Sequence, residues 1–158
     1  GMHILYYTKH KERDVEKSLG AKKVTLPTLL RQADVVTLHV PLLPQTHHLI
    51  GRNELKQMKS TAFLINTSRG PVIDEAALAV ALRQKQIAGA GLDVYENEPA
   101  MAKGLVNIPS AVLLPHIGSA TIETRTAMAN VAAKNVIAFV QKRRLPNLVN
   151  APLIHHTA

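Results

Sequence analysis

The chain has 158 residues, 46% of them hydrophobic and 19% charged, so it can bury one sizeable core but is too short for two full domains. It has no cysteine, which excludes disulfides and thiolate chemistry, and we expect a soluble, cytoplasmic protein because it has neither a signal peptide nor an apolar stretch of membrane-spanning length. The net charge of +8 comes from basic residues spread along the chain without interleaved aromatics, so we expect no nucleic-acid binding.

The first half of the chain alternates short apolar runs with segments of helical character. Pro41 would end the apolar run at 35–40, and Asn53 would cap the helix that follows it. Charged residues at 9–17, followed by Gly20, separate the first run from the rest. We expect strands at 3–7, 35–40 and 62–66, and helices at 28–32 and 53–58.

The second half continues the alternation. Asp74 is expected to cap a helix that runs to Gln86, and a longer helix rich in Ala and Val should run from Thr121 to Lys142. Strands are expected at 88–94 and 111–114, with a loop at 96–109 between them. Continuous apolar strands that alternate with helices predict an α/β fold, in which helices cover both faces of a parallel sheet.

In such a sheet, ligands bind outside the carboxyl ends of the strands. The residues of interest are therefore the polar ones that directly follow each expected strand, and the parallel arrangement should gather them at one edge. They fall in five segments: 8–10, 39–41, 67–70, 93–98 and 116–119.

Three of these segments carry groups with specific chemistry. In Asn66–Gly70, Arg69 can bind a carboxylate through two parallel hydrogen bonds, or it can pair with Asp74 or Glu75. In the acidic segment 91–99, we interpret Glu96 as part of a solvated loop. In segment 113–121, a histidine lies between Pro115 and Gly118; a lone histidine is usually structural, but this one has a possible glutamate partner at the ligand-binding edge.

In this order, N-T-S-R-G at 66–70, D-V-Y-E-N-E-P at 93–99 and P-H-I-G at 115–118 resemble the D-isomer-specific 2-hydroxyacid dehydrogenase family, which includes glyoxylate and hydroxypyruvate reductases. The resemblance covers nearly the whole chain. It implies a Rossmann-like, doubly wound parallel sheet and hydride transfer between a nicotinamide cofactor and a small 2-keto or 2-hydroxy acid. It further implies that Arg69 orients the substrate, that His116 is the acid–base group, and that Glu98 pairs with His116.

The resemblance also implies a set of cofactor-binding residues. Some should lie beside the nicotinamide, others should line the cofactor cleft, and those after the first strand should hold the ribose. The set comprises Thr8, Lys9, His39, Val40, Pro41, Thr67, Ser68, Asp93 and Gly118. The pattern implies no metal ligands.

The sequence departs from the family pattern near its start. The G-x-G-x-x-G turn that should precede the first strand is absent, so we expect a sheet truncated at the N-terminus, without its first βα unit. Residues 1–142 would form the truncated nucleotide-binding domain. Residues 143–158 would form a tail that returns to a substrate domain outside this chain.

The residues after the first strand bear on the choice of cofactor. NAD-binding members carry an acidic residue there, whereas this chain has Thr8, Lys9, His10 and Lys11. A 2′-phosphate would be attracted by these groups, which favours NADP over NAD, although the two lysines can also be read as an ordinary solvated turn.

Two other functions compete with the dehydrogenase. The same fold and catalytic residues occur in corepressors that bind a dinucleotide and recruit partners, but the chain shows no regulatory tail or peptide-docking surface. The chain could also be an inactive truncated product. Whichever function is correct, the helix expected at 121–142 should bury its apolar side chains against another protein surface. We therefore predict a homo-oligomer.

Overall fold

A computed structural model describes residues 1–149. The chain divides into two compact units, of which the first is Gly1–His116 and the second begins at Ile117. Among the described residues, no helix has both the length and the apolar character needed to cross a bilayer.

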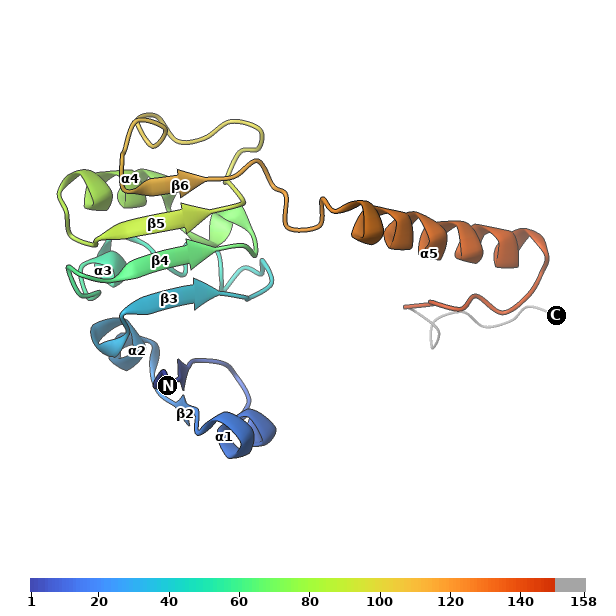
Figure 1. The fold of residues 1–158 in the computed structure, drawn as a ribbon, viewed down its shortest axis with the longest axis horizontal. Coiled ribbons are helices and arrows are strands. Elements are labelled where there is room, and N and C mark those ends of the chain that lie inside the picture. The colour runs from blue at the N-terminus through green and yellow to red at the C-terminus, as the bar shows by residue number, and fades with distance from the viewer. Residues whose placement is uncertain (150–158) are drawn as a thin grey trace. The chain divides into compact units, whose positions relative to one another are not determined.

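The core of the first unit is a parallel sheet of four strands in the order β3-β4-β5-β6. The strands are Val35–Leu38, Phe63–Asn66, Gly89–Leu92 and Ala111–Leu113. All four lie within the segments expected from the sequence, and Figure 1 shows their arrows pointing the same way. The prediction of an α/β, Rossmann-like parallel sheet is confirmed.

A second, two-stranded parallel sheet pairs β1 (Leu5–Tyr6) with β2 (Lys22–Lys23). Helix α1 (Arg13–Leu19) connects them and ends at Gly20, whose φ of 65° is a left-handed conformation that glycine adopts without strain. The sequence did not predict α1 or β2. Neither has a buried residue, so neither shows the apolar periodicity by which sequence analysis finds elements.

Two helix starts differ from their predictions. Helix α2 (Leu26–Gln32) begins earlier than expected, because Thr25 caps it by accepting a hydrogen bond from the Thr28 N–H and Pro27 fits in the first turn. Helix α3 (Arg52–Leu55) is preceded by Gly51 at the cap position, so the assignment of that role to Asn53 is wrong. There the Glu54 carboxylate accepts a hydrogen bond of 3.1 Å from the Gly51 N–H.

Helix α4 (Glu75–Arg83) confirms its predicted cap. The Asp74 carboxylate accepts a hydrogen bond of 2.8 Å from the Ala77 N–H, which satisfies one of the free donors of the first turn. A short 3-10 turn, η1 (Gly70–Val72), leads into this helix from the end of β4.

The two faces of the main sheet differ in burial. Val36 and Leu64 face a core to which helices α2, α3 and α4 contribute, whereas Val35, Phe63 and Val112 are 58%, 47% and 63% exposed. Neighbouring residues of a strand point to opposite faces, so these values separate a covered face from an open one. The sequence predicted helices on both faces of the sheet. Within this unit, helices cover one face and the other is open.

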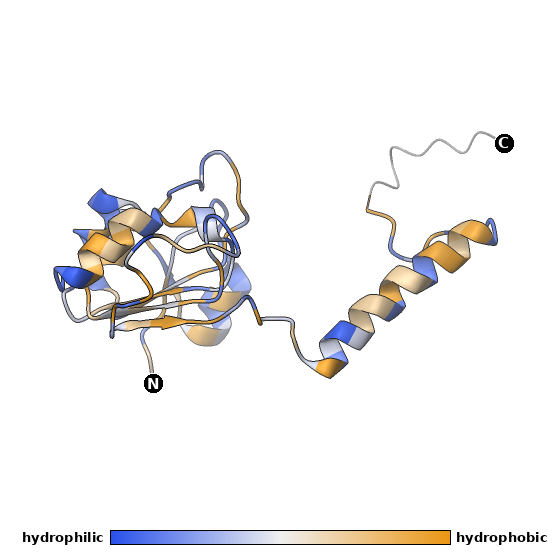
Figure 2. Cartoon of the chain, turned by 90° about the horizontal axis from the view of Figure 1, so that it is seen from above, coloured by the Kyte–Doolittle hydropathy of each residue, from blue (hydrophilic) through white to orange (hydrophobic). Residues whose placement is uncertain are grey.

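The second unit contains helix α5 (Ile122–Val140), which is capped by Thr121 as its predicted start requires. It has no buried residue, and Figure 2 shows apolar stretches along its length. Large apolar side chains are exposed from its first turn to its last: Ile122, Met128, Val131, Val136, Ile137, Phe139 and Val140. The predicted domain division after residue 142 stays a prediction, and residues 150–158 of the expected tail lie outside the described residues.

Candidate active site

The carboxyl ends of the four main strands are aligned. Leu38 pairs with Asn66, Asn66 with Leu92, and Leu92 with Leu113. The residues that follow directly are therefore placed in one row along one edge of the sheet: His39, Thr67, Asp93 and Leu114. This edge is where the sequence led us to expect the functional groups.

Asn66, the last residue of β4, shapes the turn that carries Arg69. Its side chain is 1% exposed; its amide donates to the Arg69 carbonyl at 3.0 Å, and its oxygen accepts from both the N–H and the hydroxyl of Ser68. These three bonds hold the turn closed and leave Arg69 exposed at its tip.

The Arg69 side chain does not form the alternative ion pairs considered from the sequence. Its Nη1 donates a bond of 2.6 Å to the Ser68 carbonyl, while Asp74 caps α4 and the Glu75 carboxylate accepts a bond from the Ala102 N–H. The guanidinium is thus exposed rather than bound to the start of α4, as a ligand-binding role requires.

Gly70 lets the Arg69 turn pack directly against the segment that follows β5. A Cβ atom at Gly70 would lie 1.9 Å from both the carbonyl carbon and the carbonyl oxygen of Tyr95, which is well inside van der Waals contact. Only glycine permits this approach of two backbones. The approach brings the Arg69 turn beside the acidic segment that contains Glu98.

Glu98 and His116 form a hydrogen-bonded pair. Nδ1 of His116 lies 2.8 Å from Oε2 of Glu98, and the other carboxylate oxygen accepts a bond of 3.1 Å from the Tyr95 N–H. The hydrogen bond from His116, followed by that from Tyr95, lowers the pKa of Glu98. The contact expected from the sequence between these two side chains is present.

Tyr95 connects all three segments and was not singled out by the sequence analysis. Its hydroxyl donates a bond of 2.7 Å to the Leu114 carbonyl, two residues before His116, and its N–H binds Glu98. Burial, with added repulsion from Asp93, raises the pKa of its phenol. An aromatic side chain with a polar tip, directly between the acidic residues of this segment, was the available signal.

Glu96 is not the solvated loop residue that we predicted. Its carboxylate lies 2.5 Å from Nε2 of His48 and also accepts a bond of 3.2 Å from the Glu75 N–H. The partner residues are distant in sequence, so no local pattern could reveal them. His47 and His48, whose ring nitrogens lie near the Glu96 carboxylate, were missed for the same reason.

The expected cofactor residues of the main sheet lie along the row of strand ends or next to it. Thr67 is exposed and Ser68 half-buried, while Asp93 is 4% exposed and its N–H donates to the Asn66 carbonyl. His39 is exposed and bonds to Thr37 at 2.9 Å. Val40 packs against the core, and Pro41 accepts a bond from Thr46.

Thr8 and Lys9, which were also expected to bind the cofactor, are not brought to this row. Thr8 and Lys9 follow β1 in the two-stranded sheet, where the Lys23 ammonium donates a bond of 3.0 Å to the Lys9 carbonyl. Lys11 forms an ion pair with Glu16 at 3.2 Å. Gly118 belongs to the second unit, so its cofactor role stays a prediction.

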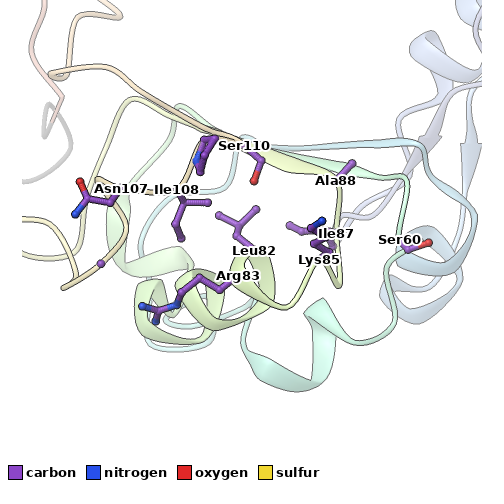
Figure 3. Close-up of a pocket in the computed structure, with 11 residues that line it drawn as sticks. Ser60, Leu82, Arg83, Lys85, Ile87, Ala88, Asn107, Ile108 and Ser110 are labelled. Carbon is purple, nitrogen blue, oxygen red and sulfur yellow. The ribbon is translucent and has the colours of Figure 1, made fainter.

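A pocket of about 710 Å³ lies at the opposite edge of the sheet (Figure 3). Ser60, Ala88 and Ser110 line it, and each comes just before a strand, so the pocket is at the amino ends of β4, β5 and β6. Because the hydrogen-bonded acid–base pair and the Arg69 turn are at the carboxyl ends, we place the candidate active site there and not in this pocket.

Comparisons with a family profile and with curated proteins point to the same family. The sequence profile described as "D-isomer specific 2-hydroxyacid dehydrogenase, NAD binding domain" matches residues 1–118. A glyoxylate reductase from Thermococcus litoralis is 50% identical over 154 residues, which are 98% of this chain and 46% of that protein. The chain therefore spans about half the length of the curated relatives that it matches.

Solved structures agree with the sequence comparison. A Thermus thermophilus protein superposes with a TM-score of 0.86 at 43% identity, over 94% of this chain and 46% of its own. An NADPH-dependent glyoxylate/hydroxypyruvate reductase from Sinorhizobium meliloti, in complex with NADP and malonate, superposes with a TM-score of 0.88 at 33% identity. That match covers 100% of this chain and 49% of the reductase.

Proposed function

Since this chain belongs to the D-isomer-specific 2-hydroxyacid dehydrogenase family, we propose that it provides the catalytic groups of a nicotinamide-dependent reductase. The proposed reaction converts a small 2-keto acid, glyoxylate or hydroxypyruvate, into the 2-hydroxy acid. The observation that carries the proposal is the Glu98–His116 hydrogen bond at the carboxyl edge of the sheet. An imidazole held by a carboxylate is suited to exchange a proton with a substrate oxygen near neutral pH.

His116 is proposed to be the general acid in the direction of reduction. Nδ1 is used by Glu98, so proton transfer falls to Nε2. The Glu98 carboxylate fixes the orientation of the imidazole through its contact with Nδ1. When hydride reaches the carbonyl carbon, the carbonyl oxygen takes the proton from Nε2, and the product is the neutral hydroxyl.

Arg69 is proposed to bind the substrate carboxylate. Its side chain is at the tip of the turn that Asn66 holds closed, and Gly70 keeps this turn against the Glu98 segment. A guanidinium there can form two parallel hydrogen bonds to the carboxylate and stabilise negative charge that develops on the keto oxygen. This arrangement would orient the keto group toward His116.

The residues at the strand ends fit a nicotinamide dinucleotide, which would supply the hydride. Thr67 and Ser68 offer hydroxyl groups beside the buried Asp93, and all three follow strands whose carboxyl ends are aligned. Lys9 follows β1, and the ammonium of Lys23, the last residue of β2, donates to the Lys9 carbonyl, with no acidic residue at positions 8–11. Two ammonium groups favour a 2′-phosphate, so we propose NADP as the preferred cofactor. The Sinorhizobium meliloti reductase, solved with NADP, supports this choice.

A chimeric enzyme tests the proposed function. This chain would replace the matching 154 residues of the Thermococcus litoralis glyoxylate reductase, and oxidation of NADPH and NADH would be followed with glyoxylate, hydroxypyruvate and pyruvate. We expect reduction of glyoxylate or hydroxypyruvate, with NADPH as the better donor. A chimera that folds and binds the cofactor, yet reduces none of the three acids, would overturn the proposal.

A further inference from the structure

Two histidines and a glutamate outside the proposed catalytic pair form a compact group of potential metal ligands. His47, His48 and Glu96 each direct one ligand atom into a space where all three atoms lie within 4.8 Å of one another. We call this group the His–His–Glu cluster. The two imidazole rings are 4.1 Å apart between centroids and tilted by 31°, and both side chains are exposed.

The backbone that carries the two histidines is fixed to the segment before α4. The His48 N–H donates to the Pro71 carbonyl at 2.8 Å, and the Ile50 N–H donates to the Val72 carbonyl at 3.1 Å. Ile50 also forms a parallel β-bridge with Ile73. The histidines therefore project from a hydrogen-bonded backbone, so a ligand would not have to order a loose loop in order to bind.

Glu96 is held from the other side. Its Oε2 accepts a bond of 3.2 Å from the Glu75 N–H, and its own N–H donates to the Glu75 carboxylate. Glu75 is 2% exposed and also accepts a bond from the Ala102 N–H. A ligating carboxylate that is itself hydrogen-bonded is the usual arrangement in metal sites, because the outer contacts orient the ligand.

The ligand types identify the class of ion. Two imidazoles and one carboxylate suit zinc and neighbouring transition metals, whereas magnesium and calcium prefer sites built of oxygen alone. In a tetrahedral zinc site with metal–ligand distances of about 2.0–2.1 Å, ligand atoms are roughly 3.3 Å apart. The His48–Glu96 pair, now 2.5 Å apart, would need to open by less than 1 Å, which the exposed His48 side chain can do.

We propose that the His–His–Glu cluster binds one Zn²⁺ ion, with water at the remaining coordination position. Such an ion would cross-link the segment of His47 and His48 to the segment of Glu96, two residues before Glu98. Its role would be to stabilise the segment that presents the catalytic pair, and it would not take part in proton transfer. The proposal uses none of the residues assigned to the reaction and stands independently of the proposed function.

Calorimetric titration with ZnCl₂ tests the proposal on the whole chain. The sequence has a second histidine pair at His155 and His156, so the reference protein carries His155→Gln and His156→Gln to keep that pair from binding zinc. We expect the reference to bind one equivalent of Zn²⁺ and to melt at a higher temperature when zinc is added.

Two variants and one control assign the binding to the cluster. His47→Gln and Glu96→Gln should each weaken zinc binding at least about tenfold, since even supporting residues of metal sites are worth 10–100-fold. His116→Gln is the matched control, because His116 also lies beside a glutamate but outside the cluster, and it should leave the affinity unchanged. His47→Gln alone decides the test if Glu96→Gln fails to fold.

The proposal is overturned if the reference protein takes up no zinc in the titration. It is also overturned if His47→Gln binds zinc as tightly as the reference, or if only His116→Gln abolishes binding. The last outcome would assign the zinc to the Glu98–His116 pair.

Discussion

At the scale of single residues, the Glu98–His116 pair has a defined electrostatic state. The hydrogen bond from His116, with that from the Tyr95 N–H, lowers the pKa of Glu98, so its carboxylate is ionised at neutral pH. Because the pKa of Glu98 is lower in the folded chain than in the unfolded chain, the pair stabilises the fold at pH values above the unfolded-state pKa of Glu98. This stabilisation is lost as the pH falls through the lower, folded-state pKa, so stability should depend on Glu98 in the acid range.

Replacement of Glu98 by glutamine should flatten the acid-side loss of stability. Glutamine keeps the size of the side chain but has no carboxyl group to protonate, so stability should no longer fall as the pH drops through the lowered pKa of Glu98. Urea denaturation of the unchanged chain and of Glu98→Gln at a series of acid pH values measures the effect. An acid-side fall as steep in Glu98→Gln as in the unchanged chain would argue against an ionised Glu98 held by His116 and Tyr95.

Replacement of Arg69 by lysine should lower kcat/KM of the chimera for glyoxylate roughly 10–100-fold. A lysine keeps the charge but cannot reproduce two parallel hydrogen bonds, and a charged hydrogen bond is worth about 1.5–3 kcal/mol. Arg52→Lys, on the exposed surface of α3, is the matched control and should have no effect. Equal kinetics for Arg69→Lys and Arg52→Lys would remove Arg69 from the substrate site.

At the scale of elements, the site depends on three strand ends that are tied together by one loop. Tyr95 contacts the Arg69 turn through the close approach of Gly70. It contacts Glu98 through its N–H, and it contacts Leu114, the residue after β6, through its hydroxyl. The loop between β5 and β6 therefore contacts all three segments that carry the proposed catalytic groups. A change in this loop should alter stability and geometry together.

Gly70→Ala should destabilise the chain by about 3 kcal/mol, the upper range for overpacking, because the added Cβ would collide with the Tyr95 backbone. Gly91→Ala is the matched control: its Cβ would meet only the end of the flexible Ile65 side chain, at 3.1 Å. Chemical denaturation of both variants measures the difference. If Gly70→Ala were as stable as the control, the backbone contact would be looser than described.

The sequence predicted the elements that bury apolar residues and missed those that do not. The strands of the main sheet were expected within a few residues, since each is a continuous apolar run, and the Asp74 cap follows from local chemistry. Helix α1 and strand β2 are exposed and charged, so no pattern marked them. The cap of α3 was misplaced because a glycine, Gly51, holds that position and gives no side-chain signal.

At the scale of the whole molecule, the parallel topology explains why residues far apart in the sequence could be predicted to form one site. Aligned strand ends place the groups after β4, β5 and β6 along one edge, whatever the intervening loops contain. The contacts that come from those loops could not be predicted, and His48–Glu96 and Tyr95–Leu114 are examples. The predicted homo-oligomer and the cytoplasmic location stay predictions.

Cofactor preference is also predicted at the scale of the whole molecule. Thr8 and Lys9 follow a strand of the two-stranded sheet, whereas the segments of Glu98 and His116 follow strands of the main sheet. In the chimera, Lys9→Glu should weaken NADPH binding roughly tenfold, close to the value of one charged hydrogen bond to phosphate, and should leave NADH binding nearly unchanged. Lys56→Glu, on the exposed surface next to α3, controls for the change of net charge. Equal losses for NADPH and NADH would place Lys9 away from the 2′-phosphate.

The central claim is that His116 exchanges the proton in ketoacid reduction, and the turnover number of His116→Ala in the chimera tests it most directly. A positioned acid or base is worth about 10²–10⁴-fold in rate, so we expect a loss of that size. Affinity for NADPH should stay close to that of the parent chimera, and His3→Ala, which changes an exposed histidine before β1, should retain full turnover. Near-full reduction of glyoxylate by His116→Ala would contradict the account.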